Sequence, residues 1–286
     1  PMPLSIYEDD DIADIERGPT RGDAVEVADG RDPVLAVTGV DMAFEDKLIF
    51  EDLDLQVFEG EVLVILGFSG CGKSVLLKLM SGLLQPQAGT IVHRGRDIAD
   101  MSEAELVEMR KSMSYVFQNN ALFDSQSVLE NVAFGLLEHT KQSDAEIRQR
   151  VVECLGYVGL APDDLGYDIL TRMPAELSGG MRKRVALARA VATRPRVILY
   201  DDPTGGLDPQ SVTRIGDMME RLQAELNLTT VVVTGDMKIA FRVANRMALL
   251  HNHHVAHLGT PDYFRECDAP EVVEFVRDPE GRAVRY

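Results

Sequence analysis

Residues 67–74 read Gly67-Phe68-Ser69-Gly70-Cys71-Gly72-Lys73-Ser74, and this stretch decides the fold. It fits the pattern G-x-x-x-x-G-K-[ST], in which glycines let the backbone curl so that several N–H groups point at phosphate oxygens. In such a loop Lys73 reaches the β- and γ-phosphates of a nucleotide and the Ser74 hydroxyl binds Mg²⁺. The apolar run 62–66 predicts a strand before the loop, and the spacing of residues 73–84 predicts a helix after it. This context favours a phosphate-binding loop over an ordinary glycine turn.

A second carboxylate-bearing strand supports the same interpretation. Residues 197–200 are apolar, short and typical of a buried parallel strand, and Asp201 follows them directly. In a fold with a phosphate loop, an Asp at this place orients the ligands of Mg²⁺. Many strands end in Asp, so the residue is informative only together with the loop.

A third motif, Leu177-Ser178-Gly179-Gly180-Met181, stands at the start of a helix predicted to run to residue 191. Small residues at a helix N-terminus expose N–H groups and the positive end of the helix dipole, which suits an anion. A plain helix cap is the alternative. Because one nucleotide pocket has no use for two phosphate-binding helix ends, we expect this one to complete the pocket of another copy.

With these motifs in this order, the chain resembles the ATP-binding cassette (ABC) transporter ATPase subunits over residues 35–260. The resemblance implies an α/β fold: a P-loop (RecA-like), mostly parallel sheet flanked by helices, an antiparallel β element, and an inserted helical subdomain at about 119–185. It also implies ATP and Mg²⁺ as ligands and a head-to-tail dimer with a second ABC ATPase subunit, the same chain or a different one. A separate membrane permease would contact residues of about 119–140, which places the chain at the cytoplasmic face of the membrane.

The same resemblance assigns roles to single residues. For ATP they are Phe44 against the adenine, Gly67, Ser69, Gly70, Cys71, Gly72, Lys73, Ser74 and Val75 around the phosphates, and Ser178, Gly179, Gly180 and Asp208 for the opposite side of a partner's pocket. For Mg²⁺ they are Ser74, Gln118 and Asp201, and for the hydrolytic step Asp202, Gln118 and the position of Gly235. Phe44 is nearly as well explained as a core residue of a strand.

Two positions depart from the family pattern. The family has Glu after the strand-end Asp, where it polarises the attacking water, and this chain has Asp202, which withdraws the carboxylate by about 1.5 Å. The family has His after the strand at 231–234, and this chain has Gly235, which offers no donor. None of the six histidines can be moved into that register. We therefore expect ATP binding with slow hydrolysis, unless neighbouring groups compensate.

Short stretches resemble the Mla/Mce-type ATPases, which power lipid traffic between bacterial membranes. They are Ala121-Leu122-Phe123-Asp124-Ser125, Glu130-Asn131-Val132, Glu138-His139-Thr140 and Met181. The resemblance implies lipid or phospholipid transport through the permease. The alternatives are an importer ATPase for another solute and a degenerate module that closes on ATP but relies on a partner ATPase for turnover.

Charge and hydropathy exclude other classes. The 286 residues hold 29 basic and 47 acidic side chains, a net charge of -18, which argues against a protein that grips nucleic acid through its phosphates. Apolar runs are too short to cross a bilayer, which takes roughly 20 residues, so we expect another chain to span the membrane. Three widely spaced cysteines predict neither a disulfide framework nor a Cys-x-x-Cys metal site.

The two ends of the chain and one histidine cluster lie outside these motifs. Residues 1–34 contain ten acids and three arginines and predict a poorly ordered tail, or else an acidic docking or autoinhibitory arm. Residues 261–286 predict a short helix and a tail that pack on their own domain or on a neighbouring protomer. The cluster His251-Asn252-His253-His254 with His257 could form a transition-metal site, but it lies where the resembled family has an exposed hairpin, so the resemblance implies a solvated turn.

Overall fold

Short, mostly apolar strands form the centre of the molecule. The computed structural model describes residues 31–45, 47–162 and 168–276. A six-stranded sheet has the order β10-β9-β3-β8-β7-β6, and its neighbours are parallel from β9 to β6. Its strands are β3 (Val62–Gly67), β6 (Met113–Val116), β7 (Val197–Asp201), β8 (Thr229–Val233), β9 (Arg246–His251) and the antiparallel β10 (His254–Gly259). Because helices cover one face of the sheet and the antiparallel sheet with α1 covers the other, β3, β7 and β8 are buried along their whole length.

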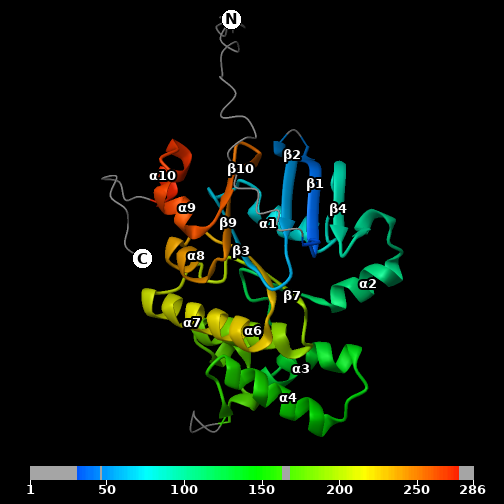
Figure 1. The fold of residues 1–286 in the computed structure, drawn as a ribbon. Helices are drawn as coiled ribbons and strands as arrows, with labels where there is room; N and C mark the ends of the chain where they lie inside the picture. Colours follow the sequence, from blue (N-terminus) through cyan, green and yellow to red (C-terminus); the bar gives the residue numbers. More distant parts are fainter. Residues whose placement is uncertain (1–30, 46, 163–167, 277–286) are drawn as a thin grey trace, which may run out of the picture.

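A second, antiparallel sheet covers one face of the first and lies at the upper right of Figure 1. Its order is β2-β1-β4-β5, from β1 (Leu35–Phe44), β2 (Lys47–Val57), β4 (Ala88–His93) and β5 (Arg96–Asp97). Its apolar side chains form one core with α1 (Lys73–Met80) and the facing side of β3, β7 and β8. Helix α2 (Glu103–Lys111) then leads into β6.

The opposite face of the parallel sheet carries the second core. Helices α6 (Gly179–Ala192), α7 (Pro209–Leu226) and α8 (Met237–Val243) contribute to it, and α3 (Val128–His139) and α4 (Asp144–Tyr157) pack on α6. Figure 1 shows α3 and α4 at the end of the molecule farthest from the antiparallel sheet. Helices α9 (Pro261–Glu266) and α10 (Pro270–Val276) lie at the β9–β10 side.

Local sequence explains where the helices begin and end. Helices α2, α3 and α4 each begin after a serine, Ser102, Ser127 or Ser143, that forms a capping box with a glutamate three residues on. Helix α1 is shorter than the predicted 73–84 because Gly82, at φ 66°, ends it. The N–H of Gly82 donates to the carbonyl oxygen of Leu79, and the N–H of Leu83 donates to the carbonyl oxygen of Lys78. This is the Schellman arrangement, in which a left-handed glycine satisfies the last carbonyls of a helix.

The predicted α/β fold is confirmed, and the hairpin prediction is confirmed in part. His253 and His254 are exposed at the turn between β9 and β10, but His257 is buried in β10, so the prediction of an exposed site is wrong for it. Its ring nitrogens lie 2.7 Å from the Tyr263 hydroxyl and 2.8 Å from Glu271 Oε1, so α9 and α10 cover it. Within the described residues no cluster of His, Cys, Asp and Glu is suited to hold a metal ion.

The ends of the chain are described only in part. The predicted acidic tail up to residue 30 and the segment from 277 onward lie outside the described residues. The predicted short C-terminal helix is present as α10, and it packs on its own domain. In the described part of the chain, no helix combines the length and the apolar composition needed to cross a membrane.

Candidate nucleotide-binding site

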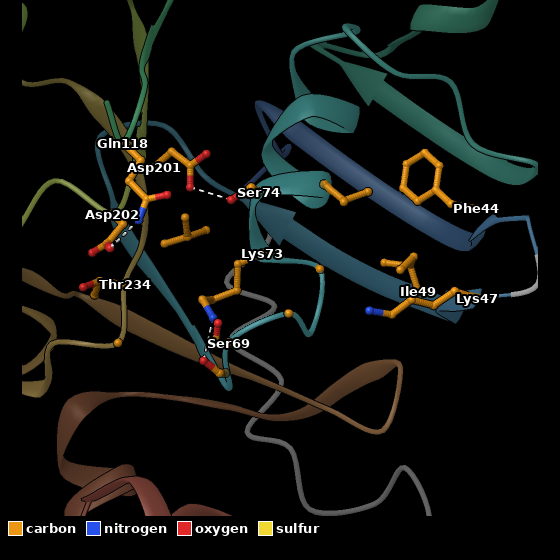
Figure 2. A pocket seen from close by; sticks show the side chains of 16 residues that line it. Phe44, Lys47, Ile49, Ser69, Lys73, Ser74, Gln118, Asp201, Asp202 and Thr234 are labelled. Carbon is orange, nitrogen blue, oxygen red and sulfur yellow. Dashed lines mark hydrogen bonds between the residues drawn. The ribbon is translucent and has the colours of Figure 1, made fainter. Parts of the chain in front are cut away.

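A cleft of about 530 Å³ opens at the carboxyl ends of the central strands. The loop after β3, the end of β7, the residues after β8 and the ends of β1 and β2 line it (Figure 2). In open α/β sheets, ligands bind at this end of the strands. The cleft brings together most of the predicted site residues: Phe44, Gly67, Ser69, Gly70, Gly72, Lys73, Ser74, Val75, Gln118, Asp201, Asp202 and Gly235.

The glycine-rich loop is held in shape by its own lysine. Lys73 Nζ donates to the carbonyl oxygens of Gly67, at 2.6 Å, and Phe68, at 2.8 Å. Gly72 precedes α1 at φ 103°, and a Cβ there would lie 2.6 Å from Ile49 Cγ2 and 2.8 Å from Phe50 Cζ. Only glycine therefore lets the loop pass this close to β2.

Cys71 stands apart from the other loop residues. It does not line the cleft; its side chain packs against the core beside α1, with Sγ 3.9 Å from Lys73 Nζ. The side chain of Cys71 therefore points away from the place proposed for the phosphates. Its backbone N–H donates to the carbonyl oxygen of Phe68 at 3.2 Å, so the structure does not bring Cys71 into the cleft with the other predicted loop residues.

Hard oxygen donors meet where the strand-end aspartate faces α1. Ser74 Oγ donates to Asp201 Oδ1 at 2.7 Å, and Tyr115 OH donates to Asp201 Oδ2 at 2.9 Å. Hydroxyl, carboxylate and amide oxygens are the ligands that Mg²⁺ prefers, so Ser74, Asp201 and Gln118 fit that ion. Burial and the nearby Asp201 carboxylate raise the pKa of Tyr115, which keeps the phenol protonated as a donor.

The residue after Asp201 has an unusual backbone and a bound side chain. Asp202 lies in the left-handed region, at φ 47°, and its Oδ2 accepts a hydrogen bond of 3.2 Å from Gln118 Nε2. Lys183 of α6 is 8% exposed, and its Nζ donates to the backbone carbonyls of Gln118 and Asp202, at 3.4 Å each. Burial lowers the pKa of Lys183, against the opposing effect of Asp202. Lys183 thus ties the backbones of the two polar residues together.

Two of these contacts had no signal in the sequence. Tyr115 lies three residues before Gln118, but only the parallel pairing of β6 with β7 brings its hydroxyl to Asp201. Lys183 looks like one of three consecutive basic residues on a helix, Arg182, Lys183 and Arg184, and only tertiary packing buries it.

The position of Gly235, two residues after β8, is open. A Cβ on Gly235 would meet no atom within 4 Å, so nothing in the fold excludes a larger side chain there. The neighbouring Thr234 is fully buried, and its Oγ1 accepts from the N–H of Asp236. Asp236 in turn caps α8 by accepting from the N–H of Lys238.

The adenine candidate lies at the other side of the loop from the carboxylates. Phe44, with Lys47 and Ile49, lines the cleft beyond α1, as Figure 2 shows. Its side chain is 44% exposed, so the alternative that it is a core residue of the strand is wrong. An exposed aromatic ring at a cleft edge is suited to stack on a flat base.

The predicted residues for a partner's pocket lie elsewhere. Ser178, Gly179, Gly180 and Asp208 line a second cavity of about 270 Å³, which shares no lining residue with the cleft. Ser178 Oγ accepts from the N–H of Met181 and caps α6, while Asp208 caps α7. Hydrogen bonds from Ser211 hold the pKa of Asp208 below its usual value. The two sets of predicted ATP-binding residues therefore line two separate cavities of the chain.

Known proteins resemble this chain over most of its length. The family model described as ABC transporter matches residues 50–205. A protein of Mycobacterium leprae named a probable ribonucleotide transport ATP-binding protein, mkl, is 40% identical over 251 residues, 87% of this chain and 71% of that one. MlaF of Haemophilus influenzae, the ATP-binding protein of an intermembrane phospholipid transport system, is 39% identical over 241 residues, 84% of this chain and 89% of that one.

A solved structure extends the likeness to three dimensions. A dimeric ATP-binding cassette in a post-hydrolysis state, bound to ADP and Pi, is 30% identical with a TM-score of 0.70, over 79% of this chain and 98% of that one. The chain belongs to the ABC transporter family and is an ATPase of the ABC type.

Proposed function

We propose that this chain binds Mg-ATP in the cleft at residues 67–74, hydrolyses it slowly, and powers lipid transport through a separate membrane permease. Nucleotide binding is supported by one observation: Lys73, the hydrogen-bonded pair Ser74–Asp201 and the hydrogen-bonded pair Gln118–Asp202 all line one cleft. The loop N–H groups and Lys73 would hold the phosphates, and Phe44 would stack on the adenine. Ser74, Asp201 and Gln118 would hold Mg²⁺, which neutralises charge on the phosphates when bound.

Slow hydrolysis follows from the two altered positions. Asp202 keeps a carboxylate to orient the attacking water, but the side chain is short and already accepts from Gln118. Gly235 supplies no donor to the γ-phosphate. The groups for binding are complete while those for the chemical step are altered, so affinity is retained and turnover is reduced.

The divided pocket supports a dimer. Ser178, Gly179, Gly180 and Asp208 would close over the ATP of a second ABC subunit, which would close over this one. With an identical partner both sites are slow. With a different partner that has the family's Glu and His, this chain completes one pocket that hydrolyses ATP at the usual rate, and its own pocket stays slow.

Residues 119–140, at the start of the proposed helical subdomain 119–185, carry an apolar surface suited to the permease. It consists of Phe123, Phe134 and Leu137, which are 39%, 37% and 54% exposed, and the two phenyl rings lie 4.7 Å apart. A groove of about 400 Å³ adjoins Phe134. Consecutive residues Asn120 and Ala121 have positive φ, and Arg189 holds both by their carbonyls. Strained backbone of this kind concentrates at functional surfaces.

Lipid is proposed as the cargo because the 121–125, 130–132 and 138–140 stretches resemble Mla/Mce-type ATPases and MlaF is among the relatives. The permease would place the chain at the cytoplasmic face of the membrane.

Calorimetric titration of the purified chain with Mg-ATP tests the nucleotide part. We expect saturable binding of one nucleotide per chain, and about tenfold weaker binding for Lys73→Ala, because a charge-assisted contact to phosphate is lost. Lys78→Ala, on the same helix and outside the cleft, is the matched control and should bind as the parent chain does. Absence of binding by the parent chain would refute the proposal.

Co-purification from membranes tests the docking surface. Leu137→Asp places a charge in the apolar surface and should reduce recovery of an integral membrane partner about tenfold, since burying an unpaired carboxylate is costly. Leu48→Asp, an exposed leucine on β2, is the matched control and should leave recovery unchanged. Mass spectrometry of the recovered complex identifies the permease and any bound lipid; equal recovery of both variants would count against this surface.

A further inference from the structure

The C-terminal helix reaches the phosphate-binding loop. The ring centroids of Phe68, in the loop, and Phe275, in α10, lie 4.4 Å apart with their planes inclined by 51°. From this contact we infer that α10 positions the loop for nucleotide, with Phe275 as a positioning residue. The inference rests on the proposed binding of Mg-ATP at residues 67–74.

Phe68 is well placed to transmit such an effect. Its carbonyl oxygen accepts from Lys73 Nζ at 2.8 Å and from the N–H of Cys71 at 3.2 Å, so its backbone is part of the cradle. Its side chain does not line the cleft and is 44% exposed. A ring anchored on the outside of the loop restrains the backbone without occupying the place of the nucleotide.

Helix α10 is a firm support because its other side chains are anchored in the core. Val272 and Val276 are 0% and 4% exposed and belong to the core beneath the parallel sheet. Between them and the loop, Phe275 packs partly against the same core. Apolar anchors before and after Phe275 fix the direction in which its ring points.

A partly buried chain of polar contacts fixes α10 to β10 and α9. His257 Nε2 lies 2.8 Å from Glu271 Oε1 of α10, and His257 Nδ1 lies 2.7 Å from the Tyr263 hydroxyl of α9. The hydrogen bond from His257 lowers the pKa of Glu271, which keeps the carboxylate charged as an acceptor. Phe264, 1% exposed, anchors α9 itself. The contact with Phe68 is therefore made by a segment tied to the sheet at several points.

Restraint of the free loop improves affinity because less freedom is lost when nucleotide binds. Aromatic pairs contribute enough beyond their buried area to change an equilibrium constant by about three- to tenfold. We expect Phe275→Ala to weaken Mg-ATP binding by about that factor and to raise KM for ATP while kcat changes little.

The test is equilibrium titration of the full chain with a fluorescent ATP analogue, for Phe275→Ala, Phe68→Ala and the double variant, with thermal unfolding measured alongside. We expect each single variant to bind three- to tenfold more weakly and the double variant to bind no more weakly than either one, since both remove the same contact. Glu274→Ala, an exposed neighbour on α10, is the matched control and should bind as the parent chain does. Phe275→Leu, which keeps apolar volume in the core but lacks the ring, replaces Phe275→Ala if the latter fails to fold.

The outcomes separate this inference from the proposed function. If the parent chain does not bind the analogue, both are overturned. If it binds and Phe275→Ala binds equally well or better, or if the two single effects add, only the positioning role is overturned.

Discussion

Replacing Asp202 by Glu and Gly235 by His in the same chain should raise the steady-state rate of phosphate release by about 100-fold. Glu is one methylene longer than Asp, so its carboxylate lies closer to the attacking water. A misplacement of about 1 Å can lower the rate on the order of 100-fold. His returns a donor to the γ-phosphate. Mg-ATP affinity should stay within about twofold, because Lys73, Ser74 and Asp201 are untouched.

The surroundings of both positions admit the change. A Cβ on Gly235 meets no atom within 4 Å, so the imidazole has room at the edge of the cleft. The Asp202 carboxylate lies against Gly205, where a Cβ would be 2.2 Å from its Oδ2, and it accepts from Gln118. A longer side chain extends past this crowded place toward the cleft. We expect the double variant to exceed the product of the two single variants, because His and Glu act on the same water and phosphate.

Phosphate release by the parent chain, the two single variants and the double variant gives the measurement. Asp202→Asn is the control, since it keeps the shape of the side chain and removes its charge; it should fall below the parent rate. Equal and fast rates in the parent and double variants would mean that neighbouring groups already compensate for both substitutions. No rate in any of the four would favour the degenerate module that depends on a partner for turnover.

The fold was predictable because its strands and loop are local in the sequence. The runs at 62–66, 197–200 and 230–233 are short and, apart from Thr230, apolar, as is typical of strands buried on both faces, and the glycine pattern at 67–74 has few other uses. Strand β6 was not predicted because its middle residues, Ser114 and Tyr115, are only partly buried and interrupt the apolar run.

The gathering of the predicted residues in one cleft follows from the family motifs. The separation of Ser178-Gly179-Gly180 from the loop agrees with the expectation that one chain cannot use two phosphate-binding helix ends. The hydrogen bonds of Tyr115 and Lys183 were not predictable, because each depends on which strands and helices become neighbours. The burial of His257 has the same origin: a histidine near a turn looks exposed until α9 and α10 cover it.

Replacing Gly72 by Ala should lower the free energy of unfolding by about 3–5 kcal/mol and weaken nucleotide binding, whereas Gly70→Ala should cost about 1–2 kcal/mol. Both glycines have positive φ, 83° at Gly70 and 103° at Gly72, so both substitutions strain the backbone. They differ in space: a Cβ at Gly70 meets nothing within 4 Å, while one at Gly72 lies within 2.9 Å of atoms of Ile49 and Phe50. Phe50 is fully buried in the core between the two sheets and cannot turn away.

Thermal unfolding of the two variants separates backbone strain from steric overlap of the new Cβ, because both variants have the strain and only Gly72→Ala has the overlap. In a domain of this size each 1 kcal/mol shifts Tm by roughly 2–4 °C, so Gly72→Ala should unfold about 10 °C below the parent chain and Gly70→Ala only about 4 °C below it. Titration with Mg-ATP above the Kd should recover part of the loss for Gly70→Ala, whose loop keeps its shape, and much less for Gly72→Ala. If both variants unfold at the same temperature, the close approach of the phosphate loop to β2 does not hold the loop, and the narrow fit between the antiparallel sheet and α1 contributes little to the site.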